Sequence, residues 1–161
     1  MENNKVRLVC ENEKIEVDFD AVKKSPVLYS MIEDTNNEGE IVIPNMRADI
    51  LRKVIEFCEH YRNTRAKKIT RPLHRKNLTD NGVDPWDANL IAFNNPEDLI
   101  DLIVAANFLD IEDLLELGCA KVAVLIKNKN VEEIREFLNI DNDLTSGEEA
   151  RIKEELQRSN N

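Results

Sequence analysis

Apolar residues alternate with polar ones only near the start of this chain, and farther along they recur at the spacing of amphipathic helices. Residues 5–9 (KVRLV) and 14–19 (KIEVDF) alternate around a short polar turn, which is the pattern of a half-buried β-hairpin. A β-branched run at 41–43, stopped by Pro44, predicts a third strand. Strands followed by a long run of helices are typical of the α+β class, which we therefore expect.

Helical patterns fill most of the rest of the chain. Ser25 can accept a hydrogen bond from a first-turn N–H, and Pro26 suits the first helical position because its missing donor costs nothing there. Asn130 and Thr145 are each followed three residues later by a glutamate that can bond back to the cap. The predicted helices lie at about 26–34, 46–61 and 146–157, and others begin near Asn95, Asp110 and Asn130.

The last predicted helix, at about 146–157, has few apolar side chains. Apart from Ile152 and Leu156 its side chains are mostly polar or charged. A short helix that buries little is marginal in water by itself. We expect this helix to pack against something else.

Residues 62–84 separate two structured blocks. The segment lacks apolar periodicity and ends at Gly82 and Pro85, so it is predicted to be a solvated loop. Charge runs of this kind are usually just solvated, although docking to an acidic partner or to phosphates is an alternative. Against Asp80 alone, residues 62–80 carry the basic side chains Arg62, Arg65, Lys67, Lys68, Arg71, Arg75 and Lys76.

The charge and hydropathy of the chain argue against nucleic acid and membrane as partners. The net charge is −10, and both nucleic acid and anionic membranes repel an acidic protein. No aromatic residue lies between Arg62 and Trp86 to stack on bases. The start MENNKVRL has no apolar signal core, and no apolar run is long enough to cross a bilayer. We expect no nucleic acid and no membrane.

The cysteines point to a reducing compartment. Cys10, Cys58 and Cys119 are odd in number, far apart and each set in an apolar pattern. This usage predicts buried thiols rather than disulfides. The expected location is the cytoplasm and the nucleus.

The residue types that carry out catalysis or hold cofactors are not arranged for either. The glycines are isolated from one another, so no phosphate-binding loop is predicted. Cys58 and His60 are the nearest pair of possible metal ligands, but two positions apart on a helix they face different ways. A nucleophile would need a base, and only His60 and His74 are available. We expect no catalytic residue, no metal and no cofactor.

Two stretches of the C-terminal half, AANFLDI and EEIREFLNIDNDLT, are quite specific, and SPVLYSMIED, IVIPNM and ILRKVIEFCEHY precede them in matching order. In these stretches the chain resembles the S-phase kinase-associated protein family over nearly its whole length. The resemblance implies a BTB/POZ fold, a small sheet with surrounding helices, followed by a helical extension. It assigns 1–61 to the N-terminal part of the BTB/POZ domain, 62–84 to a basic loop, 85–127 to the C-terminal helices of that domain and 128–161 to an F-box-binding helical extension.

The resemblance also implies a function without catalysis. Family members are adaptor subunits of cullin-RING (SCF) E3 ubiquitin ligases, which link a cullin to F-box substrate receptors. Asn107 and Phe108 stand where the family presents Asn-Tyr to the cullin, so the hydroxyl is lost and the ring is kept. From the residues alone, Phe108 could equally fill the core at a helix end.

A second set of residues matches the family's F-box-binding positions. Val122 and Ile126 share one helical stripe with Leu114 and Gly118, which would serve an internal core equally well. The segment Leu138–Leu144 is too irregular for helix packing alone and is the more specific recognition surface. The matching positions are Leu115, Val122, Ile126, Ile134, Leu138, Ile140, Asn142 and Leu144.

Three departures from the family pattern and three alternative interpretations accompany this assignment. Leu138 and Leu144 replace phenylalanines and Arg158 replaces a tryptophan, so aromatic anchors common at interface centres are missing. The loop at 62–80 is basic, whereas relatives are often acidic there. The nearest alternative is an elongin C type of adaptor, which lacks the extension. A self-associating BTB scaffold or kinetochore structural component, with a possible homodimer when free, is the second. An enzyme of an unrecognised type is the third.

Overall fold

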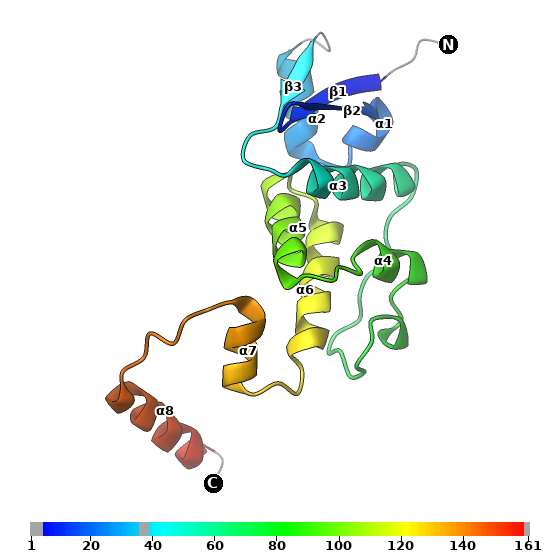
Figure 1. Ribbon diagram of the computed structural model, residues 1–161. Coiled ribbons are helices and arrows are strands. Elements are labelled where there is room, and N and C mark those ends of the chain that lie inside the picture. The colour runs from blue at the N-terminus through cyan, green and yellow to red at the C-terminus, as the bar shows by residue number, and fades with distance from the viewer. Residues whose placement is uncertain (1–4, 36–38, 160–161) are drawn as a thin grey trace. The chain divides into compact units, whose positions relative to one another are not determined.

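The computed structural model describes residues 5–35 and 39–159, in which a small mixed sheet is followed by helices (Figure 1). The chain divides into two compact units, Met1–Lys127 and Asn128–Asn161. The first unit contains the sheet, and the predicted α+β class is confirmed.

The sheet has the order β2-β1-β3 among the described residues. Strand β1 (Lys5–Cys10) pairs antiparallel with β2 (Glu13–Asp18) and parallel with β3 (Glu40–Val42). Glu11 and Asn12 form the hairpin turn with φ of 49° and 66°, the left-handed backbone that matches the twist of two adjoining strands. The predicted hairpin and third strand are therefore confirmed.

The predicted helices are all present, and two short ones were missed. Asp18 and Asp84 each cap one of the missed helices, α1 and α4, which are too short to show an apolar period in sequence. The helices are α1 (Phe19–Val22), α2 (Pro26–Asp34), α3 (Ala48–His60), α4 (Pro85–Leu90), α5 (Pro96–Phe108), α6 (Glu112–Ile126), α7 (Val131–Leu138) and α8 (Ser146–Ser159), with a 3₁₀ turn η1 at Thr79–Asn81.

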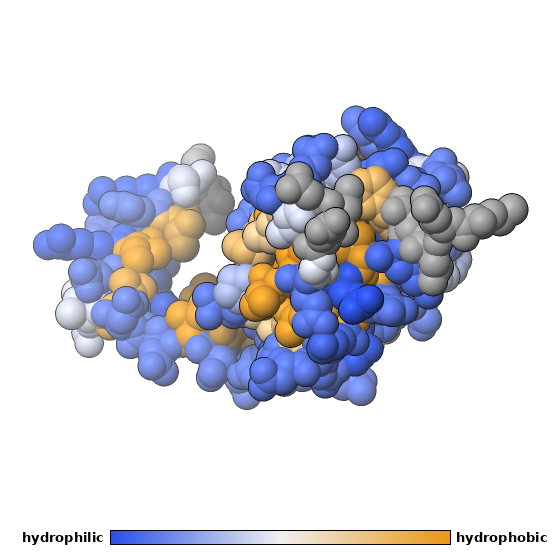
Figure 2. Space-filling view, turned by 90° about the horizontal axis from the view of Figure 1, so that it is seen from above, coloured by the Kyte–Doolittle hydropathy of each residue, from blue (hydrophilic) through white to orange (hydrophobic). Residues whose placement is uncertain are grey.

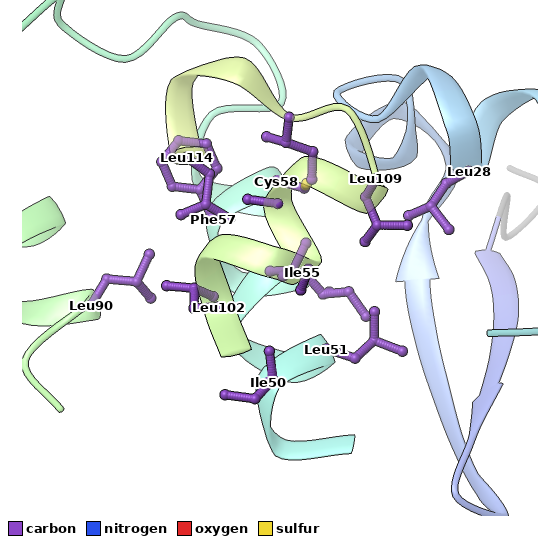
Figure 3. Close-up of a cluster of buried hydrophobic side chains, with 14 of the residues drawn as sticks. Leu28, Ile50, Leu51, Ile55, Phe57, Cys58, Leu90, Leu102, Leu109 and Leu114 are labelled. Carbon is purple, nitrogen blue, oxygen red and sulfur yellow. The ribbon is translucent and has the colours of Figure 1, made fainter. Parts of the chain in front are cut away.

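The core of the first unit forms where α3 lies between the sheet and the pair α5 and α6 (Figure 1). Buried side chains from α2, α3, α4, α5 and α6, together with Leu109, gather in one cluster (Figure 3). A Cβ atom on Gly118 would lie 2.5 Å from Cγ1 of Ile103. Gly118 thus allows α6 to approach α5 closely, which explains a glycine inside a helix.

Ser25 joins two distant parts of this core. Its Oγ accepts a hydrogen bond from the Leu28 N–H (3.1 Å), which confirms the predicted cap of α2. The same hydroxyl donates to the carbonyl of Leu109 (2.5 Å), directly after α5. One fully buried side chain therefore starts α2 and fixes it against the end of α5.

Two expectations about individual segments were wrong. Residues 62–84 are not simply solvated, because Leu78 and Val83 are buried in the core. Cys10 and Cys58 are buried as predicted, and burial raises the pKa of the Cys58 thiol to about 12. Cys119 is exposed, since it lies one residue after Gly118 on α6 and so about 100° around the helix from the face packed on α5.

A buried carboxylate on α4 is hydrogen-bonded to the tyrosine that follows α3. The Tyr61 hydroxyl donates to Oδ1 of Asp87 (2.8 Å), and Asp87 is only 3% exposed. Burial raises the pKa of the Asp87 carboxyl, and the Tyr61 hydrogen bond opposes that shift in part. A carboxyl whose pKa is raised by folding stabilises the protein while it is protonated, and this stabilisation is lost as the pH rises through the folded-state pKa.

We therefore predict that Asp87→Asn gains stability relative to the unsubstituted chain as the pH rises. Between about pH 3 and about pH 7, the difference in free energy of unfolding between the two chains should change in favour of the variant. Urea unfolding at several pH values measures the free energy of unfolding of both chains. Comparing how this free energy changes with pH in the two chains cancels any pH-independent effect of the amide. A difference independent of pH would show that the Asp87 pKa is not raised.

The second unit has two helices and no core of its own. Asn130 and Glu133 form a reciprocal capping box at α7, and Thr145 bonds with Glu148 at the start of α8, both as predicted. In the described part of this unit, residues 128–159, no side chain is buried. The apolar side chains of α7 and α8 are therefore only partly covered within this unit.

Neither a membrane-spanning helix nor a metal-binding group is found in the described part of the chain. No helix within 5–35 and 39–159 has the length and apolar character needed to cross a bilayer. Over the same residues, no three His, Cys, Asp or Glu side chains converge as metal ligands. His60 instead stacks on Trp86, with ring centroids 3.6 Å apart.

Candidate protein interaction sites

An apolar groove of about 410 Å³ lies where the last turns of α5 meet the loop between β3 and α3. Val104 and Phe108, one helical turn apart on α5, are 60% and 44% exposed. Exposed apolar side chains that gather at a concave surface are typical of interaction sites. The side chains and loop residues that form most of the groove are Pro44, Met46, Arg47, Ile50, Val104 and Phe108.

Hydrogen bonds hold the loop side of the groove. The Cys10 thiol donates to the carbonyl of Met46 (2.7 Å), which ties the loop to β1. Arg47 Nη1 donates to Asp98 Oδ1 (2.7 Å) and Asp101 Oδ2 (3.1 Å) of α5. These bonds to carboxylates raise the pKa of the Arg47 guanidinium above its ordinary value. The groove is therefore largely shaped before any partner arrives.

The structure places the two predicted cullin-binding residues at neighbouring hollows. Phe108 lines the groove and does not fill the core. Asn107 is also exposed, but it lines a separate hollow of about 340 Å³. Leu115, one of the predicted F-box-binding residues, borders that second hollow.

Other groove residues were missed by the sequence analysis. Val104 lies four positions before Phe108, so helical spacing alone could have identified it. Pro44 and Met46 come from a loop some sixty residues away in sequence, and no local pattern connects them to α5. Only the packing of α3 on α5 brings them together.

On α6 the predicted stripe is only half buried. Leu114 and Gly118 are buried, whereas Val122 and Ile126 are intermediate in exposure. Each step of four residues overshoots a full helical turn by about 40°, so the later members rotate away from α5. Leu115 is likewise half buried. All three predicted F-box residues of α6 therefore present part of their apolar surface outward.

The remaining predicted F-box residues lie in the second unit. Ile134, Leu138 and Leu144 are half buried, while Ile140 is 55% exposed and Asn142 is exposed. Asn139 ends α7 in the left-handed conformation (φ 52°) that helix C-termini favour. The chain that follows is irregular in structure, as predicted.

Asn142 organises the connection to α8. Its Oδ1 accepts from the Leu144 N–H (3.1 Å), and its Nδ2 donates to Glu149 Oε1 (2.6 Å). The Asn142 side chain thus bonds both to the backbone just after it and to the first turn of α8. On α8 itself, Ile152 and Leu156 are 44% and 58% exposed. Figure 2 shows hydrophobic residues reaching the surface of each unit among hydrophilic ones.

Known proteins are similar to this chain over most of its length. Residues 5–63 match the model of the Skp1 family tetramerisation domain, and 112–159 match that of the Skp1 family dimerisation domain. The S-phase kinase-associated protein 1 homolog of Tetrahymena thermophila is 51% identical over 154 residues, which covers 95% of this chain and 92% of that protein.

Fungal proteins are similar over a slightly shorter stretch. The E3 ubiquitin ligase complex SCF subunit sconC of Aspergillus terreus is 41% identical over 142 residues, covering 88% of this chain and 86% of that protein. The protein of the same name in Aspergillus clavatus is 40% identical over 140 residues, covering 86% of each chain.

Proposed function

The chain belongs to the Skp1 family, and from this membership we propose that it is an adaptor subunit of an SCF E3 ubiquitin ligase, linking a cullin to F-box substrate receptors. The observation that carries the proposal is the second unit, whose described residues 128–159 bury no side chain although they include apolar ones. A partner that covers these side chains would supply the core that the unit lacks by itself.

The adaptor acts by geometry rather than by catalysis. Holding a substrate receptor and a cullin in one assembly turns the encounter between substrate and ubiquitin donor into an effectively intramolecular event. The local concentration of substrate at the ubiquitin donor then rises without any new chemistry on this chain. Ubiquitin transfer would take place on other subunits, and this chain would contribute no catalytic residue, metal or cofactor.

The cullin would bind at the end of α5. Phe108 and Val104 offer exposed apolar area beside a groove whose loop side is held in place, and Asn107 adds a polar contact next to them. An aromatic ring in a concave apolar site is a usual anchor of a protein interface. We include Met46 and Pro44 with the predicted pair, because they line the same groove as Phe108.

The predicted F-box contacts include residues of α6 and, separately, residues of the second unit. The predicted F-box residues of α6, which are half buried, are Leu115, Val122 and Ile126. Those of the second unit are Ile134, Leu138 and Leu144, which are half buried, and Ile140 and Asn142, which are exposed. A stable subunit interface needs a sizeable apolar area, which a set of half-buried side chains supplies collectively. Aliphatic Leu138 and Leu144 provide smaller anchors than aromatic rings would.

The same apolar side chains would remain uncovered in a free chain. We therefore propose that the chain can pair with a second copy when no F-box is present, which would hide Ile140 and its neighbours from water. The buried, unpaired thiols of Cys10 and Cys58 support a location in the cytoplasm and nucleus, where thiols stay reduced.

Co-purification tests the adaptor role most directly. The full chain is expected to retain an F-box peptide, and a chain truncated after Lys127 is expected to lose it while still binding the cullin N-terminal domain. Retained cullin binding is the control that the truncated chain is folded. If neither chain bound the peptide and the full chain formed only homodimers, the adaptor assignment would be replaced by a self-associating scaffold.

A further inference from the structure

Five exposed cations on the segment 65–76 have no carboxylate partner among residues 5–35 and 39–159. Arg62 pairs with Asp18 (3.2 Å), and Arg71 lies 3.9 Å from Glu116. The other Lys and Arg side chains of residues 62–76 have no carboxylate oxygen within 4.0 Å among residues 5–35 and 39–159. These unpaired cations, named here the basic segment cluster, are Arg65, Lys67, Lys68, Arg75 and Lys76.

Apolar anchors hold the cluster against the first unit. Ala66, Ile69 and Leu73 alternate with the cations and are each half buried against the hydrophobic core. A run of charge that is merely solvated needs no such anchors. The chain between Arg65 and Lys76 is therefore positioned by packing rather than extended freely into water.

Hydrogen bonds between side chains and the backbone fix the far end of the segment. Lys127 Nζ donates to the carbonyls of Leu73 (2.9 Å) and His74 (2.5 Å). Asn81 Oδ1 accepts from the N–H groups of His74 (2.9 Å) and Arg75 (3.0 Å), and its Nδ2 donates to the Arg75 carbonyl (2.9 Å). The positions of Arg75 and Lys76 are thus set by the fold, which lowers the entropy cost of binding.

We propose that the basic segment cluster docks an acidic polypeptide segment of a partner protein. Unpaired cations on an ordered surface attract carboxylates and lose little by desolvation at the rim of an interface. Lysine supplies three of the five cations. Its ammonium group is a compact charge that can donate to a carboxylate in many geometries. A short run of Asp and Glu side chains fits this cluster and requires no shape-specific pocket.

Nucleic acid fits the surface less well. Residues 62–85 contain no Phe, Tyr or Trp on which a base could stack. The rest of the chain is strongly acidic, since the net charge is −10 despite this basic segment, and it would repel a long polyanion that extends past the cluster. A short acidic peptide can stay within the cluster and avoid that repulsion.

Fluorescence anisotropy with the full chain and a labelled oligoglutamate peptide tests the proposal. Replacing the cluster by glutamine (Arg65→Gln, Lys67→Gln, Lys68→Gln, Arg75→Gln, Lys76→Gln) should weaken binding by about tenfold or more at low salt. Rising NaCl should weaken binding to the unsubstituted chain, and an oligoglutamine peptide of equal length should not bind.

A matched variant removes the same charges elsewhere. Lys5, Arg7, Lys129, Arg151 and Lys153 are also exposed, and their replacement by glutamine removes two arginines and three lysines, as in the cluster variant. Its affinity should change by less than about threefold. Because every replaced side chain is exposed, both variants should keep the thermal unfolding temperature of the unsubstituted chain.

Three results would overturn the proposal. The unsubstituted chain could fail to bind oligoglutamate at low salt, or both variants could lose affinity equally, which would indicate net charge alone. A single-stranded RNA of equal charge could bind more tightly than the peptide and depend on the cluster, which would make the surface a nucleic-acid site. The cluster lies outside the proposed cullin and F-box residues, so these results would leave the adaptor assignment untouched.

Discussion

Phe108→Glu is expected to weaken binding of the cullin N-terminal domain by about 100-fold or more, while the fold stays intact. The side chain is 44% exposed and lines the apolar groove with Val104 and Met46. A partner covering the groove would have to desolvate the new carboxylate, and the guanidinium of Arg47, which also lines the groove, is already bonded to Asp98 and Asp101. Isothermal titration calorimetry with the full chain measures the affinity, and a thermal melt checks the fold.

Two further variants separate the groove from general surface effects. Ile152→Glu makes the same kind of change at a residue that is also 44% exposed but lies on α8 and does not line the groove. Its cullin affinity should match that of the unsubstituted chain, and Phe108→Tyr, which restores the family's hydroxyl, should bind at least as well. Unchanged affinity for Phe108→Glu would remove the end of α5 from the cullin interface.

The second large effect concerns the second unit. Amide hydrogens of α7 and α8 are expected to exchange with solvent at least about 100-fold faster than those of α3 and α5 in the free chain. Exchange from a helix requires local opening, and its cost depends largely on the apolar contacts that break. Helix α3 carries Leu51, Val54 and Phe57 in the core, whereas α7 and α8 bury no residue.

Adding an F-box peptide should slow exchange in α7 and α8 while leaving α3 unchanged. Binding supplies the apolar burial that the second unit lacks, so opening then also costs the binding free energy. Hydrogen exchange followed by mass spectrometry resolves the two regions in one experiment, with α3 as the internal reference. Slow exchange of α7 and α8 without peptide would contradict the account of a unit that needs a partner.

Much of the fold could be predicted because it rests on local interactions. Ser25 with Pro26, and Asn130 with Glu133, satisfy backbone donors within a few residues of themselves, so their caps were visible in sequence and are present in the structure. The hairpin followed from alternation in the two neighbouring strands. The short helices α1 and α4 were not predicted, because four and six residues are too few to show a helical period.

Errors arose where burial depends on distant parts of the chain. Leu78 and Val83 lie in a segment with no local pattern, and only their insertion into the core of the first unit buries them. Cys119 shares its apolar sequence surroundings with buried residues, yet the orientation of α6 leaves it exposed. Sequence periodicity shows that a helix has an apolar face, but the position of that face is set by the neighbouring helices.

The sequence by itself determined the α+β class, the order of the elements and the helix caps, because each depends largely on contacts within a few residues. Tertiary structure decided the rest. Helix α3 begins at Ala48 with an N–H that is bonded to Glu11, which comes 37 positions earlier. Likewise, Met46 and Phe108 form one groove only because α3 packs on α5. Such long-range contacts depend on the whole core folding at once, and no local pattern encodes them.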